Sequence, residues 1–172
     1  MKDARAIAAL MIADKDFARS RNRPPVHPLA LELVELKSPD VNEQLVAALP
    51  SSDPAIRASI IFVLSQENDA SLAALLMPYL DDAETNVRAQ VAKWIGRSRD
   101  ASRVDELLEA LARETSDGRL DAGEIEAVLA QIAALGELKD RRAAGPLREL
   151  LEKTKDGRVT AALEEALSKI YD

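Results

Sequence analysis

The clearest chemical pattern in the chain lies in residues 113–124, RETSDGRLDAGE. Five of these residues match ligand and turn positions of an EF-hand calcium loop: Asp117, Gly118, Leu120, Asp121 and Glu124. Arg113, however, stands where the first carboxylate ligand belongs, and a cation there removes a ligand and repels Ca²⁺. We therefore expect a turn at Asp117-Gly118 and a capping box formed by Asp121 and Glu124. These three acidic residues are weak metal candidates, and no cofactor is expected.

The single histidine, His27, is the next residue that could do chemistry. A general base needs a nucleophile and an orienting group beside it, and the proline-rich stretch SRNRPPVHP around His27 offers neither. We therefore expect His27 to be a surface loop residue and the chain to lack catalytic residues. Trp94 falls on an apolar stripe of helical spacing, which favours a core position over a ligand platform.

The composition excludes several classes of function. The net charge of −7, from 30 acidic and 23 basic side chains, repels nucleic acid, and the basic cluster from Lys139 to Arg148 alternates with Glu149 and Glu152 as a solvated helix face does. The absence of cysteine excludes disulfides and thiolate metal sites. No stretch approaches the roughly 20 apolar residues of a membrane span. Acidic residues in MKDARAIAALMIADKD argue against a signal peptide, so we expect an acidic, cytoplasmic protein.

Residues 82–111 describe a unit that other parts of the chain repeat. A shift of 31 residues places Ile56 on Val87, Arg57 on Arg88 and Leu64 on Ile95. In this unit an acidic turn precedes a first helix, Gly96 ends that helix, and Asp100 opens a second one. Self-similarity at a fixed period of this length is typical of stacked helix hairpins, each of which buries its apolar stripe against the next.

The repeats predict one domain, residues 1–172, because each hairpin needs its neighbours. After residue 111 the period lengthens to 40, the spacing of Gly96 and Gly136, so about nine residues are inserted in 113–123. The expected segments are an N-terminal helix (1–20), a connector (21–28), helix hairpins (27–49, 53–80, 84–114 and 121–153) and a C-terminal half repeat (156–171).

The order of an acidic turn, Val-Arg, Leu-Gly, Asp and an Ala-x-x-Leu helix resembles the HEAT-like repeats named after phycobilisome lyases. NVRAQVAKWIG and PAIRASIIFVLS carry this resemblance, and LGELKDRRAAGPLRELLEK shows the same order with less detail. The resemblance covers about residues 25–171. It implies an all-α fold, a right-handed α-solenoid of about four HEAT-like helix hairpins with an extra N-terminal helix and a final unpaired helix.

In the family that the chain resembles, a turn Asp and an early Arg form a hydrogen-bonded ladder between repeats. Asp82 with Arg88 fits this pattern, whereas Ser51 replaces the Asp before Arg57 and Thr160 replaces the Arg of the last helix. We expect the ladder to be incomplete at those two places. The resemblance also implies that the second helices line the concave, partner-binding surface.

The second helices of two hairpins offer candidate partner-binding residues. In the third hairpin, Leu107 and Leu111 point one way, which turns Glu106, Glu109 and Arg113 outward. In the preceding hairpin, Leu75 and Pro78 fall at the two Glu positions with Tyr79 beside them. Large apolar side chains in that position mark a contact patch, unless this helix is buried on more than one side.

The leading hypothesis is a non-catalytic scaffold that binds another protein or peptide. The alternative is a bilin-lyase-like or other HEAT-like enzyme or enzyme subunit. The His-Glu pairs of deoxyhypusine hydroxylases are missing, and charge argues against the groove of HEAT-like DNA glycosylases. Self-assembly through the N-terminal helix, or a designed or fragmentary array, is a third possibility. The sequence alone names neither the partner nor the oligomeric state.

Overall fold

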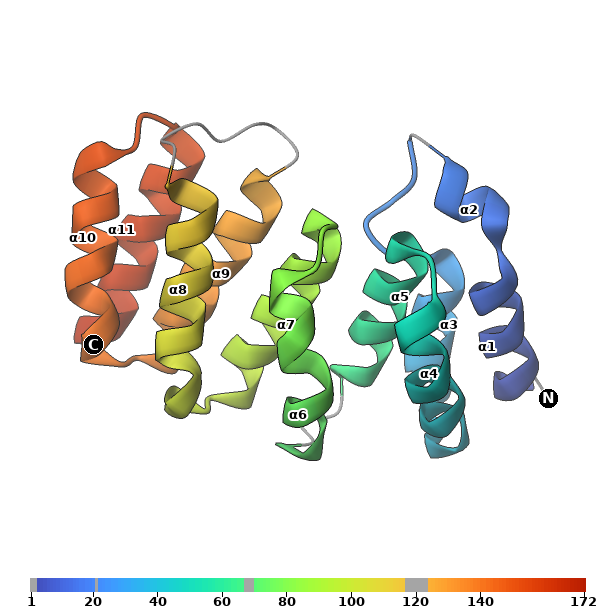
Figure 1. Cartoon of the computed structure of the whole chain (residues 1–172). Helices are drawn as coiled ribbons and strands as arrows, with labels where there is room; N and C mark the ends of the chain where they lie inside the picture. Colours follow the sequence, from blue (N-terminus) through green and yellow to red (C-terminus); the bar gives the residue numbers. More distant parts are fainter. Residues whose placement is uncertain (1–2, 21, 67–69, 117–123) are drawn as a thin grey trace. The chain divides into compact units, whose positions relative to one another are not determined.

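The structure of the chain is a computed structural model that describes residues 3–20, 22–66, 70–116 and 124–172. Every regular element in these ranges is a helix, and no strand occurs in them (Figure 1). The predicted all-α class is therefore confirmed. The chain divides into two compact units, Met1–Glu67 and Asn68–Asp172. The division falls inside the segment 53–80, so the helices on either side of it belong to different units.

The first unit is a cluster of helices around leucine and isoleucine side chains. Its α-helices are α1 (Ala4–Ala13), α2 (Lys15–Arg19), α3 (Pro28–Leu36), α4 (Asn42–Ala48) and α5 (Pro54–Leu64). Helix α3 packs against α1 and α5, and α4 contacts the same two helices. The largest fully buried side chains include Met11 of α1, Leu33 of α3, Leu45 of α4 and Ile60 of α5.

Asp14 divides the N-terminal segment, which we expected to be one helix, into α1 and α2. Its carboxylate accepts hydrogen bonds from the backbone N–H groups of Asp16 (3.0 Å) and Phe17 (2.9 Å), as the N-cap of α2. The hydrogen bond from Phe17, followed by that from His27, lowers the pKa of Asp14. The resulting bend brings the Phe17 ring centroid to 4.5 Å from that of His27.

His27 is a buried cap of α3, so the prediction of a surface loop residue was wrong. The residue is 5% exposed, and its Nδ1 accepts the backbone N–H of Leu29 at 3.0 Å. Because Nδ1 accepts, Nε2 carries the proton and donates to Asp14 Oδ2 at 3.1 Å. The His27 backbone N–H also donates to Ser59 Oγ at 2.8 Å. Asp14 and Ser59 are distant from His27 in sequence, which is why local composition did not predict the burial.

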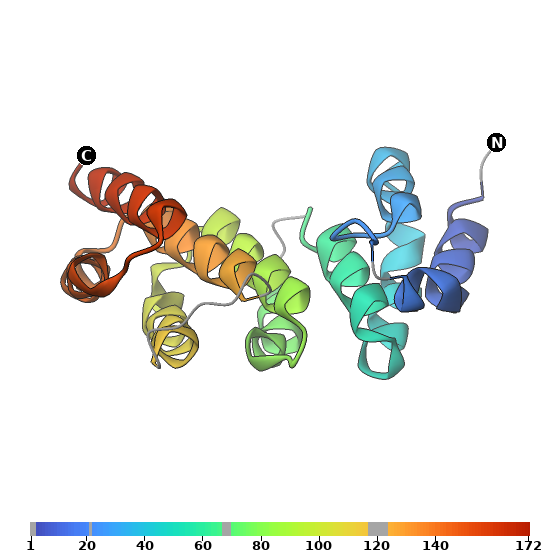
Figure 2. The same cartoon turned by 90° about the horizontal axis from the view of Figure 1, so that it is seen from above.

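The second unit consists of two layers of helices (Figure 2). One layer holds α7 (Thr85–Ser98), α9 (Ile125–Leu138) and α11 (Gly157–Tyr171), and α9 packs between the other two. The other layer holds α6 (Ala73–Leu76) with the 3-10 helix η4 (Met77–Asp81), then α8 (Val104–Thr115) and α10 (Ala144–Lys153). Contacts of η4 with α7, α8 with α9 and α10 with α11 join the layers. Trp94, at 2% exposed, belongs to this core as predicted.

Gly96 and Gly136 lie inside their helices, so the prediction that Gly96 ends the first helix was wrong. A Cβ atom built on Gly96 would lie 2.9 Å from Cα of Ala134, and one on Gly136 would lie 2.9 Å from Cα of Ala166. Because real Cβ atoms do not approach a backbone so closely, these glycines allow α7 to touch α9 and α9 to touch α11. The glycine pattern therefore marks helix contact rather than helix ends.

The helices end instead at residues with left-handed backbone geometry. Arg99 closes α7 with φ 54°, and Lys139 closes α9 with φ 53°. This conformation costs a residue with a Cβ atom about 1 kcal/mol, whereas glycine adopts it freely. A cation at a helix C-terminus recovers part of that cost through the helix dipole.

Replacing Lys139 by glycine is expected to raise the free energy of unfolding by about 0.5–1 kcal/mol, because the left-handed strain is relieved. The measurement is the urea midpoint followed by far-ultraviolet circular dichroism. Lys93→Gly, in the interior of α7, is the control and should lower stability by about 1 kcal/mol. A Lys139→Gly variant that loses stability like this control would contradict the assignment.

Candidate functional site

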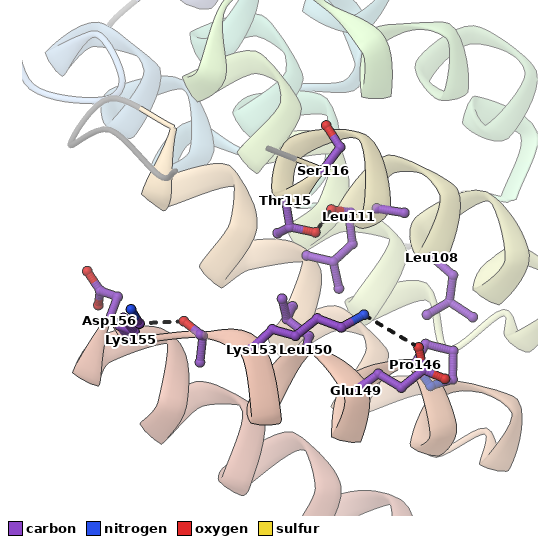
Figure 3. Close-up of a pocket in the computed structure, with 12 residues that line it drawn as sticks. Leu108, Leu111, Thr115, Ser116, Pro146, Glu149, Leu150, Lys153, Lys155 and Asp156 are labelled. Atoms are coloured by element: carbon purple, nitrogen blue, oxygen red, sulfur yellow. Dashed lines mark hydrogen bonds and ion pairs between the residues drawn. The ribbon is translucent and has the colours of Figure 1, made fainter. Parts of the chain in front are cut away.

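A groove of about 620 Å³ lies between α8 and α10 in the second unit (Figure 3). Its α8 wall consists of Leu108, Leu111, Ala112, Thr115 and Ser116, and its opposite wall consists of Pro146, Glu149, Leu150, Lys153, Thr154, Lys155 and Asp156. Leu108 and Leu150 are half-buried, so their side chains remain partly accessible. A hollow with an apolar floor and a charged edge has the character of a binding site.

The groove exists because each helix carries more apolar residues than the layer beneath it covers. In α8, Val104, Leu107 and Leu111 are buried, and Leu108 stands one position beyond that stripe. In α10, Leu147 is fully buried, whereas Leu150 is left at the edge. Adjacent residues in a helix point about 100° apart, so Leu108 cannot share the core contact of Leu107.

Arg142 joins the two walls near the beginnings of their helices. It donates to Asp105 Oδ2 on α8 and to the carbonyl of Ala101, both at 2.7 Å. It also pairs with Asp140 at 2.8 Å, and this hydrogen bond raises the pKa of Arg142 and lowers that of Asp140. The groove begins beyond this contact, at Leu108 on α8 and at Pro146 on α10.

The charges at the groove edge are not all neutralised by neighbours. Asp156 accepts the backbone N–H of Arg158 at 2.8 Å and pairs with its guanidinium at 3.2 Å, which lowers the pKa of Asp156. Lys153 faces Glu149 at 3.9 Å, and both side chains are 74% exposed, so this pair contributes little. In the part of the chain that the structure describes, no ion pair or hydrogen bond joins the Lys155 ammonium to another residue.

The two hydroxyl groups of the α8 wall donate hydrogen bonds to backbone carbonyls of the same helix. Thr115 Oγ1 donates to the carbonyl of Leu111 at 2.8 Å, and Ser116 Oγ donates to that of Arg113 at 3.0 Å. A nucleophilic hydroxyl must instead face a base that takes its proton. The arrangement therefore supplies binding surface rather than an activated nucleophile.

The predicted partner-binding residues lie in the same layer as the groove. Pro78, Glu109 and Arg113 are exposed, and Leu75, Tyr79 and Glu106 are half-buried. Arg113 pairs with Asp81 of η4 and, at 4.0 Å, with Glu109, so it links two second-layer elements. Glu106 pairs with Arg103 at 3.3 Å.

The predicted ladder residue Arg88 bonds to its own turn and to the neighbouring helix. Its Nη1 donates to the carbonyls of Asp82 (2.8 Å) and Ala83 (3.1 Å). Its Nε donates to Glu114 Oε1 on α8 at 3.0 Å. The carboxylate of Asp82 accepts the backbone N–H of Glu84 at 2.9 Å. The Arg88 contact with Asp82 thus runs through the backbone carbonyl.

Arg57 makes a corresponding turn contact in the first unit. Its Nη1 donates to the carbonyl of Ser52 at 2.7 Å, at the place where Arg88 meets Ala83 one period later. The replacement of Asp by Ser51 therefore does not remove the bond between the arginine and the backbone of its turn. In the last helix, Thr160 Oγ1 donates to the carbonyl of Asp156 at 3.1 Å.

Two of the weak metal candidates, Asp117 and Asp121, lie outside the described residues. Glu124 is described, and it is the N-cap residue of α9 without a capping bond from its side chain. Helix α9 begins at Ile125, later than the predicted capping box requires. Among the residues that the structure describes, no three potential ligands are grouped as a metal site would need.

Two comparisons bear on the class of the protein. A family model of HEAT repeats matches residues 42–129, which include α4 to α8 and the beginning of α9. No curated protein matches the chain. None of the described helices combines the length and the apolar character that crossing a membrane requires.

Proposed function

Because the chain belongs to the HEAT-repeat family, we propose that it is a protein-binding scaffold whose second-layer helices hold a partner protein or peptide. The observation that carries this proposal is the groove of about 620 Å³ between α8 and α10. It is open to solvent, has an apolar floor, and lies on the second helices of consecutive repeats. A cytoplasmic setting is part of the proposal and rests on the composition.

The surface proposed for the partner extends from the groove toward η4. Leu75, Pro78 and Tyr79 supply apolar contact at one end, and the groove supplies it at the other. Glu106, Glu109 and Arg113 lie on α8 between them and form the polar part of the surface. Protein interfaces combine apolar contacts with polar ones, as this surface does.

The test begins with capture of a partner from the cells that make the protein, followed by its identification and recombinant preparation. The affinity of the purified pair is then measured by isothermal titration calorimetry. We expect Tyr79→Glu and Leu108→Glu each to weaken binding at least about tenfold, because a buried carboxylate would replace an apolar contact.

Lys93→Glu is the matched control, since Lys93 is exposed on α7 in the other layer. This variant should bind the partner as the unaltered chain does. Equal affinity of all three variants, each shown to be folded by circular dichroism, would remove the second-layer surface from consideration.

The alternative function is bilin transfer, which rests on the resemblance of NVRAQVAKWIG to the repeats named after phycobilisome lyases. Its test is incubation of the chain with a bilin and an apo-phycobiliprotein, with covalent attachment followed by absorbance. Covalent attachment that depends on the chain would favour this alternative. If no bilin is attached, the scaffold function remains the better supported proposal.

A further inference from the structure

We infer that the groove between α8 and α10 takes an amphipathic helix of the partner that has leucine-type anchors and acidic flanking residues. This inference rests on the proposed protein-binding function and specifies the chemistry of the bound segment. It follows from what the walls of the groove offer and from the charges that remain free at its edge (Figure 3).

The walls favour a helical rather than an extended segment. The α8 wall, and the opposite wall as far as Lys153, are sides of α-helices, whose backbone N–H and C=O groups are largely bonded within their own helix. An extended peptide in this groove would leave its own backbone groups unpaired against leucine and proline, which is costly. A helix satisfies these groups internally. From Leu108 to Thr115 the α8 wall measures about 10 Å, enough for two turns of a helix.

The apolar floor defines the anchors of the bound helix. Leu108 and Leu150 face the groove from opposite sides, with Pro146 beside them (Figure 3). Apolar residues one turn apart on the incoming helix would fill the space between these walls, as in other helix-in-groove complexes.

The charges at the edge select the flanking residues. Among the described residues that form the α8 wall, none has a charged side chain. On the α10 side, Asp156 is paired with Arg158, and Lys153 and Glu149 are weakly paired with each other, so these charges offset. Among the residues that the structure describes, no ion pair or hydrogen bond joins Lys155 to another group. Lys155 therefore leaves a net positive charge on this flank of the groove, and carboxylates on that flank of the bound helix complement it.

The probe for this inference is a synthetic, fluorescein-labelled helix of about four turns with leucines at i, i+3 and i+7 and glutamates on the flanking positions. A second peptide has lysine in place of each glutamate. Fluorescence anisotropy with the full-length chain is expected to give about tenfold tighter binding of the glutamate peptide, with a smaller difference at high salt. Changing both Lys153 and Lys155 to glutamate should reverse this preference, whereas Lys93→Glu should preserve it.

The apolar contact is tested by two substitutions, Leu150→Glu and Ala112→Glu. Ala112 lines the groove and is exposed, so a glutamate there places a carboxylate in the groove without disturbing the core. Both should abolish binding of the glutamate peptide, and Leu10→Glu, at a residue 65% exposed in the first unit, should not. Equal affinity for the two peptides, or binding that survives Ala112→Glu, overturns the inference. If the inference is overturned but Leu108→Glu or Tyr79→Glu still weakens binding of the natural partner, the scaffold function remains. If both variants bind the natural partner normally, the scaffold function fails as well.

Discussion

In a Gly136→Val variant, we expect the free energy of unfolding to fall by about 3 kcal/mol, near the upper end of the usual cost of overpacking. A side chain on Gly136 would begin 2.9 Å from Cα of Ala166 and 3.1 Å from its Cβ atom. Because the obstacle is backbone, relief requires α9 and α11 to separate. For a chain of this size the melting temperature should fall by about 6–12 °C, measured by circular dichroism.

Gly145→Val is the matched control for this prediction. Gly145 lies in the first turn of α10, and nothing lies within 4 Å of a Cβ atom built there. The same substitution should therefore change stability by less than about 0.5 kcal/mol. Gly96→Val, which meets Ala134 at 2.9 Å, should behave like Gly136→Val. Similar melting temperatures for Gly136→Val and Gly145→Val would contradict the assignment of Gly136 to the close contact between α9 and α11.

The two buried glycines illustrate what the repeat pattern could and could not predict. The spacing of Gly96 and Gly136 correctly aligns two repeats, because the same helix contact recurs in each. The role of Gly96 was misassigned because glycine weakens an isolated helix, and only the close neighbour Ala134 shows why it is tolerated. Periodicity predicts which residues occupy equivalent positions in successive repeats. The residue that packs against each position determines its structural role.

His27 and Leu150 were misjudged or missed for related reasons. The burial of His27 depends on Asp14 and Ser59, which are distant in sequence. Leu150 belongs to a Leu-Leu pair, and such pairs in second helices are a signal that could have indicated a groove before the structure was known. That signal does not say how far each leucine is covered, because coverage depends on the helix beneath, and Leu150 and Leu151 are both half-buried.

Replacing Glu114 by leucine is expected to lower the free energy of unfolding by about 3 kcal/mol, the lower part of the range for breaking a buried ion pair. Glu114 Oε1 and Oε2 accept from Arg88 at 3.0 and 3.3 Å, and the two side chains are only 10% and 14% exposed. Gln131 on α9 also donates to Oε1, at 2.6 Å. The carboxylate therefore binds α7 and α9 to α8, and its loss leaves a largely buried guanidinium without a counter-charge.

The value lies at the lower part of the range because Arg88 keeps its hydrogen bonds to the carbonyls of Asp82 and Ala83. The control is the double variant Arg88→Met with Glu114→Leu, which removes the stranded charge together with its partner. Urea unfolding should show that the double variant recovers most of the loss, with a coupling energy above about 1 kcal/mol in the double-mutant cycle. Additive losses would instead mean that the pair is solvated and that apolar contacts alone hold α8 against α7 and α9.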